Sequence, residues 1–174
     1  LGASVILVTG PSTMPSPPNV KLIEVQTGRE MYKAVLDELP ADVAVFVAAV
    51  GDWYVGEVAE QKIKKNNGGP PSLKFKENPD ILHEVSNLRE KRPSLVIGFA
   101  AETSDLIKNA EIKLNKKNCD WIIANDVSTA TGIMGGDQNK ISLISEKQKE
   151  DWPLMSKTSV ATKLAAKICE SLGV

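Results

Sequence analysis

Short apolar runs alternate along this chain with longer segments in which apolar residues recur every third or fourth position. The runs predict strands and the periodic segments predict helices, because side chains alternate between two faces in a strand but return to one face about every 3.6 residues in a helix. The predicted strands cover residues 4–10, 21–26, 43–50, 94–101, 121–126 and 140–145. The predicted helices cover residues 29–39, 79–91, 104–117 and 158–172. Two strands followed by repeated helices and strands favour an α/β sandwich with a mostly parallel sheet.

Residues at the ends of these segments refine the pattern. Thr27 and Glu30 have the spacing of a capping box, so we expect the first helix to begin there. Asn78 is predicted to cap the second helix, with Pro79 at its first helical position. The nearly continuous apolar runs over residues 43–50 and 94–101 predict central parallel strands that helices cover on both faces.

The composition is that of a globular protein of ordinary charge. Its 174 residues are 42% hydrophobic and 25% charged, so we expect a single domain over residues 1–174. The 21 Lys and Arg residues nearly balance the 22 Asp and Glu residues, which argues against a nucleic-acid partner. No apolar run is long enough to cross a bilayer, so no membrane partner is expected. The 2 cysteines fit no metal-ligand spacing and are too few for a disulfide framework, which suits a cytoplasmic protein.

Candidate ligand-binding residues lie just after the predicted strands, since ligands of open parallel sheets bind beyond the carboxyl ends of the strands. Gly10 ends the first predicted strand, but no glycine-rich fingerprint leads from it into a helix, which argues against an ordinary dinucleotide fold. The small residues Ala48 and Ala49 precede Asp52, whose carboxylate can accept hydrogen bonds from a hydroxyl or an exocyclic amine of a planar ligand. Capping of a strand end is the alternative role of Asp52.

Positive charge gathers in residues 61–82, around a Gly-Gly-Pro-Pro break. The lysines of this stretch are Lys62, Lys64, Lys65, Lys74 and Lys76. The predicted helix that begins at its end would point N–H groups outward, and these donors together with the lysines predict a site for an anion. Lys113 and Lys117 are four residues apart and share one face of a predicted helix, which suggests a second phosphate contact. A solvated surface is the alternative interpretation of both groups.

Five motifs together give the chain a specific resemblance. They are AAVGDWY, EQKIKK, KENPDIL, GFAAET and IIANDVS, in this order, with KIKK beginning ten residues after the Asp of the first motif. Over essentially its whole length the chain resembles the phosphopantothenoylcysteine synthetases of coenzyme A synthesis, of the bacterial CTP-dependent type. The resemblance implies a Rossmann-like three-layer sandwich and a ligase that joins 4'-phosphopantothenate to L-cysteine.

The resemblance assigns contacts with CTP to residues at the predicted strand ends and in the predicted helices. These residues are Phe46, Val47, Ala48, Asp52, Lys62, Pro79, Asp80, Ile81, Leu82, Phe99, Lys113 and Lys117. A planar base fits beside the small strand-end residues and Phe99, and the lysines surround the phosphates. Lys62, with Mg²⁺, is the expected catalytic residue, because bringing two anions together requires a group that neutralises the developing charge. Glu102 and Asn125 lie at strand ends near the same crevice, where they contact substrate or cap turns.

The implied reaction has two steps. The carboxylate of phosphopantothenate attacks the α-phosphorus of CTP, which gives an acyl-cytidylate and pyrophosphate, and the amine of cysteine then displaces CMP. The resemblance also implies a homodimer and a link to a flavin-dependent phosphopantothenoylcysteine decarboxylase, to which bacterial members are usually fused. It assigns no residue to the metal ion.

The N-terminus departs from the family pattern. The family has an earlier strand, an Asn-bearing turn and a helix, and Leu1 corresponds to the end of that helix. We therefore expect the first strand and helix to be missing from this chain and the natural protein to be longer. Two other functions stay open: a non-catalytic nucleotide-binding module, which would bind CTP without releasing pyrophosphate, and an NAD(P)-dependent reductase, which would need the glycine fingerprint and an acidic residue after the second strand.

Overall fold

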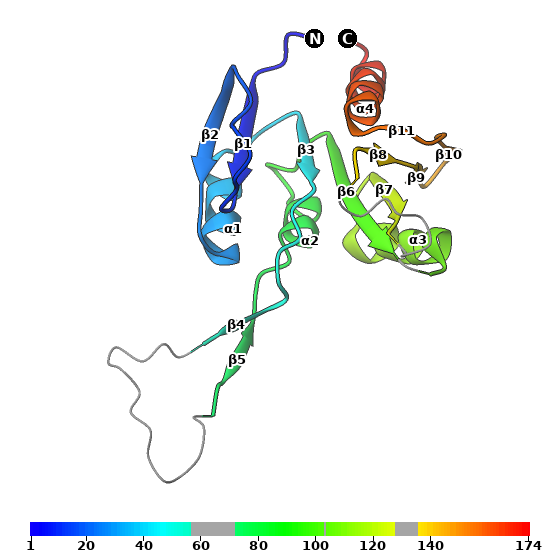
Figure 1. The fold of residues 1–174 in the computed structure, drawn as a ribbon. Coiled ribbons are helices and arrows are strands. Elements are labelled where there is room, and N and C mark those ends of the chain that lie inside the picture. The colour runs from blue at the N-terminus through cyan, green and yellow to red at the C-terminus, as the bar shows by residue number, and fades with distance from the viewer. Residues whose placement is uncertain (57–71, 103, 128–135) are drawn as a thin grey trace. The chain divides into compact units, whose positions relative to one another are not determined.

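The computed structural model describes residues 1–56, 72–102, 104–127 and 136–174. The chain forms two compact units. The first unit comprises Leu1–Leu39 and Ala48–Glu84, and the second comprises Pro40–Val47 and Val85–Val174. Figure 1 labels the helices and strands of both units.

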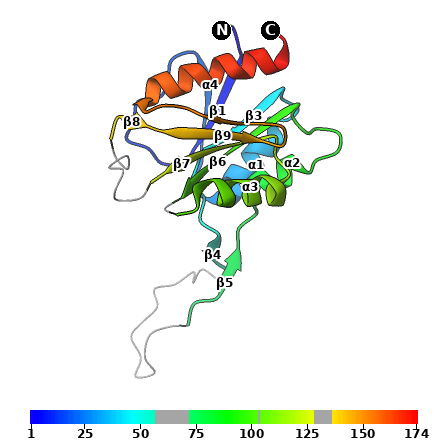
Figure 2. The same ribbon diagram turned by 90° about the vertical axis from the view of Figure 1, so that its right-hand side faces the viewer.

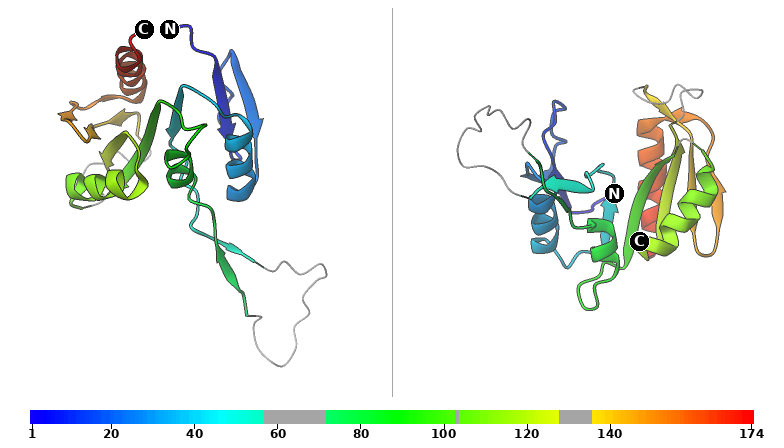
Figure 3. Two further views of the ribbon diagram at one scale, coloured as in Figure 1. Left: turned by 180° about the vertical axis from the view of Figure 1, so that it is seen from behind. Right: turned by 90° about the horizontal axis from the view of Figure 1, so that it is seen from below.

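A parallel pair of strands and one helix form most of the first unit. β1 (Val5–Thr9) pairs in parallel with β2 (Val20–Glu24), and α1 (Gly28–Asp37) follows β2 directly, in agreement with the predicted elements. The left view in Figure 3 shows α1 beside the two strands. The backbone N–H of Val25 donates to the Thr9 carbonyl at 2.9 Å, so the pairing continues to the point where α1 begins. The carboxyl ends of both strands and the start of a helix therefore meet at one edge of this unit.

The predicted capping box is confirmed at the start of α1. Thr27 Oγ1 accepts a hydrogen bond from the backbone N–H of Glu30 at 3.2 Å, and the Glu30 carboxylate accepts one from the backbone N–H of Gln26 at 2.8 Å. The hydrogen bond from Gln26 is the main reason that the pKa of Glu30 lies below its ordinary value. This arrangement fixes the residue at which α1 starts and, with it, the position of the first helical turn.

A second pair of strands, which the sequence pattern did not predict, lies in the same unit. β4 (Trp53–Val55) and β5 (Phe75–Glu77) pair antiparallel, with Tyr54 opposite Lys76. The guanidinium carbon of Arg29 lies 4.3 Å from the centre of the Tyr54 ring, a cation–π contact between the hairpin and the first turn of α1. Residues 57–71, which join the two strands, lie outside the described residues.

The helix predicted over residues 79–91 begins later than expected. α2 spans Ile81–Ser86. Asp80 caps it, because its carboxylate accepts a hydrogen bond from the backbone N–H of His83 at 3.1 Å and its carbonyl accepts one from the N–H of Glu84 at 2.9 Å. The prediction that Asn78 is the N-cap is therefore wrong, and Asn78 bonds elsewhere, as described below.

The same helix also ends earlier than predicted, and Arg92 explains why. The Arg92 Nε donates to the carbonyl of Ser86 at 2.8 Å, and its Nη2 contacts the carboxylate of Asp120 at 3.1 Å. The last carbonyls of a helix lack a helical N–H donor, and Arg92 supplies the donor for the carbonyl of Ser86. The helix can therefore end at Ser86 without a further turn. Pro93 then follows, and a residue before proline is disfavoured in a helix. The predicted extension to residue 91 is therefore wrong.

A five-stranded sheet with the order β10-β9-β7-β6-β3 forms the centre of the second unit. Its strands are β3 (Val43–Phe46), β6 (Leu95–Glu102), β7 (Trp121–Asp126), β9 (Ile141–Ser145) and β10 (Lys149–Asp151). β3, β6 and β7 run parallel, whereas β9 and β10 are antiparallel additions. A short antiparallel pair, β8 (Gln138–Asn139) and β11 (Met155–Ser156), leads into the last helix.

Two helices cover opposite faces of this sheet, as Figure 2 and the right view in Figure 3 show. They are α3 (Leu106–Lys117) and α4 (Lys157–Leu172), close to their predicted ranges. Leu95 and Ile97 of β6 share a core cluster with Val160 and Leu164 of α4, and the alternate residues of β6 point to the other face. The predicted α/β fold with a mostly parallel central sheet is confirmed. No helix in the described ranges is long and apolar enough to cross a membrane.

β3 is shorter than the strand predicted over residues 43–50. It spans only four residues and is the last strand of its sheet, paired with β6 on one side. The chain leaves the second unit after Val47 and enters the first unit at Ala48. β6 is the strand that matches the prediction, since its first four residues are buried.

Candidate functional site

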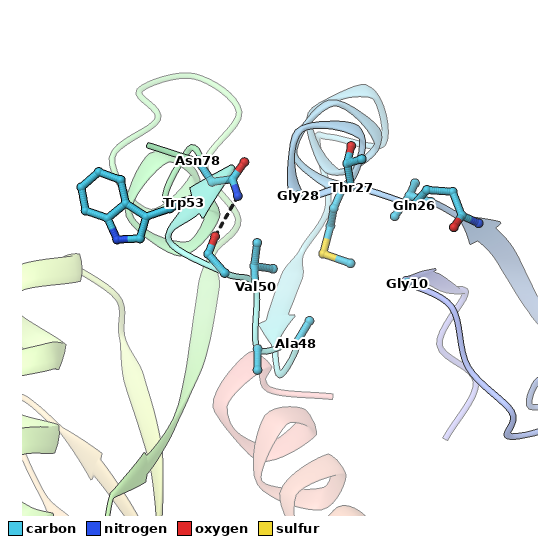
Figure 4. Close-up of a pocket in the computed structure, with 12 residues that line it drawn as sticks. Gly10, Gln26, Thr27, Gly28, Ala48, Val50, Trp53 and Asn78 are labelled. Atoms are coloured by element: carbon cyan, nitrogen blue, oxygen red, sulfur yellow. Dashed lines mark hydrogen bonds between the residues drawn. The ribbon is translucent and has the colours of Figure 1, made fainter. Parts of the chain in front are cut away.

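A cavity of about 320 Å³ lies in the first unit, beyond the carboxyl ends of β1 and β2. Its walls come from the end of β1, the turn from β2 into α1, the segment after β3, Trp53 at the start of β4 and Asn78 just after β5, as Figure 4 shows. The lining residues are Gly10, Val25, Gln26, Thr27, Gly28, Met31, Ala48, Ala49, Val50, Gly51, Trp53 and Asn78. Apolar side chains with a few amide and hydroxyl groups among them are typical of sites for small molecules.

Gly28, the first residue of α1, permits a close approach at one wall of this cavity. A Cβ atom at Gly28 would lie 2.8 Å from Cγ1 of Val50 and 3.4 Å from Cγ of Asn78. Any larger residue would force Val50 to move, so the absence of a side chain is what allows this packing. The first turn of α1, Val50 and Asn78 therefore form one packed group.

Asn78 joins two segments that are far apart in the sequence. Its side-chain Nδ2 donates to the carbonyl of Gly51 at 2.8 Å, the bond drawn in Figure 4, and its backbone N–H donates to the carbonyl of Asp52 at 2.8 Å. Residues 48–52 are thereby held against residues 78–80. Sequence reasoning missed this role and gave Asn78 only a capping function. The Asn-Pro-Asp triplet offered two N-cap residues of about equal preference, so the sequence could not decide between Asn78 and Asp80.

Half of the residues to which the resemblance assigned CTP contacts lie in the first unit. They are Ala48, Asp52, Pro79, Asp80, Ile81 and Leu82. Ala48 lines the cavity, and Asp52 is exposed beside the hydrogen bonds of Asn78. The side chains of Ile81 and Leu82 are buried, which leaves backbone groups as their means of contacting a ligand. The Asp80 carboxylate caps α2, so it has a structural role in addition to any ligand contact.

Five other assigned residues lie in the second unit, namely Phe46, Val47, Phe99, Lys113 and Lys117. Phe46 of β3 is opposite Gly98 of β6, and Phe99 is the next residue along β6. The Phe99 side chain is partly buried against the core cluster, with Val43 nearby in the same group.

Lys113 and Lys117 share one side of α3 as predicted, but both are half-buried and not fully exposed. The Lys113 Nζ donates to the backbone carbonyl of Phe99 at 2.8 Å. Because an ammonium group has three donors, Lys113 can keep this bond and still bind a phosphate oxygen. Lys117 lies in the last turn of α3, where its carbonyl accepts a bond from Nδ2 of Asn87 at 3.5 Å.

Glu102 and Asn125, whose roles the sequence left open, lie on the neighbouring strands β6 and β7. The side-chain Nδ2 of Asn109 donates to the Glu102 carboxylate at 3.2 Å and to the Ser104 carbonyl at 3.0 Å. The backbone N–H of Val127 donates to the Glu102 carbonyl at 2.9 Å. These bonds favour a structural role for Glu102 in the turn between β6 and α3.

The predicted catalytic residue lies outside the described residues. Lys62 falls within residues 57–71, as do Lys64 and Lys65. Lys76 is on β5, where its aliphatic stem lies over Gly56, since a Cβ atom at Gly56 would be 2.7 Å from Cδ of Lys76. Among the residues that the structure describes, no group of three or more His, Cys, Asp or Glu side chains is arranged to hold a metal ion.

Cys119 is poorly suited to act as a nucleophile. The residue is buried, and burial raises the pKa of its thiol to about 11. At pH 8 about one thiol in a thousand is then ionised, against about one in four for an ordinary cysteine of pKa about 8.5. We expect iodoacetamide at pH 8 to label Cys119 at least about 100 times more slowly in the folded protein than in guanidinium chloride. Peptide mass spectrometry measures both rates, and equal rates would contradict the buried thiol.

The sequence is similar to that of known proteins over nearly its whole length. A family model described as "DNA/pantothenate metabolism flavoprotein C-terminal domain" matches residues 1–172. The coenzyme A biosynthesis bifunctional protein CoaBC of Vibrio cholerae is 40% identical over 174 residues, which is 99% of this chain and 43% of that protein. CoaBC of Escherichia coli K12 is 40% identical over 159 residues, 90% of this chain and 39% of that protein. The chain thus spans about two fifths of the length of these curated relatives.

Solved structures agree with the fold. The crystal structure of the C-terminal domain of CoaBC matches with a TM-score of 0.79 and 29% identity, over 99% of this chain and 76% of that one. A structure of the DNA/pantothenate metabolism flavoprotein from Streptococcus pneumoniae matches with a TM-score of 0.78 and 22% identity, over 98% of this chain and 82% of that one. The second likeness bears on the fold alone.

Proposed function

Because this chain belongs to the family of the DNA/pantothenate metabolism flavoprotein C-terminal domain, we propose that it is a phosphopantothenoylcysteine synthetase. It joins 4'-phosphopantothenate to L-cysteine with CTP as the co-substrate. The geometric observation that supports this proposal best is the pair of hydrogen bonds made by Asn78. They join the AAVGDWY and KENPDIL segments, which carry the resemblance and most of the CTP contacts that the resemblance assigns to the first unit.

The proposed nucleotide contacts are those that the resemblance assigns. In the first unit, the Asp52 carboxylate accepts hydrogen bonds from the sugar or the base, and backbone groups of residues 79–82 contact the nucleotide. In the second unit, Phe46, Val47 and Phe99 contact the base, and Lys113 and Lys117 bind phosphate oxygens. Lys62 completes the site as the catalytic residue.

The proposed chemistry proceeds through an acyl-cytidylate. A carboxylate oxygen of phosphopantothenate attacks the α-phosphorus of CTP, the bond from that phosphorus to the bridging oxygen breaks, and pyrophosphate leaves with the electron pair. The amine of cysteine then attacks the acyl carbon, loses a proton and displaces CMP, so an amide bond forms. Lys62 is expected to stabilise the negative charge that develops during the first step.

Mg²⁺ enters this proposal as part of the Mg–CTP substrate. Magnesium ions of nucleotide sites keep several waters and are held mainly by substrate phosphates, with few protein ligands. The protein groups then act on the phosphates that the ion leaves exposed.

The proposed setting is a homodimer in the cytoplasm that works with a flavin-dependent phosphopantothenoylcysteine decarboxylase. The relatives named above are bifunctional proteins of which this chain matches about two fifths, which supports a second, fused activity. Both compact units are proposed to serve as one CTP-binding synthetase domain over residues 1–174.

Pyrophosphate release tests the proposed reaction directly. The natural polypeptide is incubated with Mg–CTP and 4'-phosphopantothenate, and cysteine is omitted so that only the first half-reaction proceeds. We expect release of pyrophosphate that stops at about one equivalent per site, and continuous turnover once cysteine is added. CTP binding without release would favour a non-catalytic nucleotide-binding module. Tight NAD(P)H binding without CTP binding would favour a reductase.

Asp52→Asn tests the first-unit part of the nucleotide site. A carboxylate accepts hydrogen bonds from two donors with full negative charge, whereas an amide has one acceptor oxygen. We expect the dissociation constants of CTP and of cytidine to rise by a similar factor of about ten, because the loss concerns sugar or base contacts and not phosphates. Isothermal titration calorimetry measures both ligands. Unchanged affinity for cytidine would rule out Asp52 as a contact to the nucleoside.

A further inference from the structure

We propose that Asn78 is a positioning residue for the nucleotide site, an inference that rests on the proposed function. Its two hydrogen bonds fix Gly51 and Asp52 against the segment that begins at Pro79. The first bond uses the side chain, and the second uses the backbone. Asn78 itself is not among the residues that the resemblance assigns to CTP, and its role is to hold two groups of assigned residues together.

The chemistry of the contact makes asparagine hard to replace at this position. The Gly51 carbonyl requires a donor, which the Asn78 amide provides at 2.8 Å. An aspartate has nearly the same shape but only acceptor oxygens when ionised, so it would oppose the carbonyl. Residues 48–52 form no part of a helix or strand, and the bonds from Asn78 hold Gly51 and Asp52 at the end of this segment.

Gly28, at the start of α1, packs closely against Val50 and the side chain of Asn78. A Cβ atom there would lie 2.8 Å from Val50 and 3.4 Å from the side chain of Asn78, so α1 presses directly on the segment that Asn78 holds. Figure 4 shows Asn78 and Val50 side by side, with the start of α1 next to them. The capping box at Thr27 fixes the position of that first turn. Asn78, Val50 and Gly28 thus act together to set the position of the Asp52 backbone.

The first arm of the test measures the positioning without any ligand. The amide of residue 78 donates to the Asp52 carbonyl, so its hydrogen exchange reports whether the segment is held. In Asn78→Asp we expect this amide to exchange at least about ten times faster, after correction for the intrinsic rate. The amide of Val25, which bonds to Thr9 in the same unit, should be unchanged. Unchanged exchange at residue 78 would overturn the inference whatever the protein binds.

The second arm measures CTP affinity by calorimetry in the natural polypeptide. We expect Asn78→Asp to raise the dissociation constant about tenfold. Asn19→Asp makes the same chemical change at an exposed turn of the same unit, at a φ of 60° that both residues tolerate, and should leave affinity within about twofold. Faster exchange together with unchanged CTP affinity would overturn the positioning role. A wild-type protein that binds no CTP would instead contradict the proposed function, and the positioning role with it.

Gly28→Ala provides an independent variant that leaves both bonding groups of Asn78 intact. The added Cβ should push Val50 and raise the dissociation constant of CTP about fivefold. Adding Val50→Ala removes the Cγ1 atom that collides, so the double variant should bind CTP within about twofold of Val50→Ala alone. If Gly28→Ala acted in another way, it would raise the dissociation constant of CTP by the same factor with or without Val50→Ala. That result would count against the inference.

Discussion

Replacing Lys62 with glutamine is expected to slow acyl-cytidylate formation by a factor of about 100 or more, as is typical when a charge-stabilising donor is removed from a closed site. Lys62 lies ten residues after Asp52 in the sequence, within the connection between β4 and β5. The β4 end of that connection is tied to α1 through the contact between Arg29 and Tyr54. The expectation for Lys62 therefore rests on its place in the KIKK motif and on its spacing from Asp52.

The Lys62 variant should separate chemistry from binding. CTP affinity is expected to fall by no more than about fivefold, because Lys113 and Lys117 still bind the phosphates in the proposed site. The measurement is pyrophosphate release with CTP and 4'-phosphopantothenate present and cysteine omitted, which isolates the first half-reaction. A parallel calorimetric titration with CTP reports binding alone.

Lys64→Gln and Lys65→Gln are matched controls, since they remove the same charge from the same stretch. Exposed charges attract an anionic substrate over a distance and are screened by salt, so each control should lower the rate only slightly and mainly at low ionic strength. A Lys62 variant with nearly normal release would show that this stretch only attracts anions. Equal damage from Lys64→Gln would lead to the same conclusion.

Local signals in the sequence predicted the elements that depend on local interactions. The start of α1 follows from Thr27 and Glu30, which bond within four residues of each other, and the structure has both bonds. β6 was predicted as a doubly covered strand from its apolar run, and its first four residues are buried. The hairpin of β4 and β5 was missed because three-residue strands are too short to show an alternating pattern.

The errors in the prediction arise where distant residues decide the outcome. α2 stops at Ser86 because Arg92 bonds to its carbonyl, and the sequence pattern of α2 contains no trace of this contact. Residues 43–50 form one apolar run, but β3 spans only Val43–Phe46, because the chain passes from the second unit to the first after Val47. For the same reason the sequence indicated Asp52 as a candidate but missed Asn78, whose function depends on Gly51, twenty-seven positions away.

Replacing Lys113 with glutamine is expected to weaken CTP binding about 30-fold, which corresponds to about 2 kcal/mol, the usual size of a hydrogen bond to a charged group. The loss of the bond to the Phe99 carbonyl should also lower the stability of the folded protein by about 1 kcal/mol. The Lys113 side chain is half-buried and bonded to β6, so its removal should affect folding as well as binding. Thermal unfolding without ligand therefore accompanies each binding measurement.

Two comparisons distinguish phosphate binding by Lys113 from the hydrogen bond that it donates to the Phe99 carbonyl. Lys108→Gln removes an exposed lysine from the same helix and should change neither stability nor CTP affinity by a measurable amount. Titration with cytidine, which has no phosphate, should show a change of less than about threefold in Lys113→Gln, because the lost attraction is to the phosphates. Equal losses for CTP and cytidine would mean that Lys113 acts through the packing of Phe99 on the base. The main phosphate contacts would then be the lysines of residues 57–71. In that case Lys62→Gln should weaken CTP binding more than Lys113→Gln does.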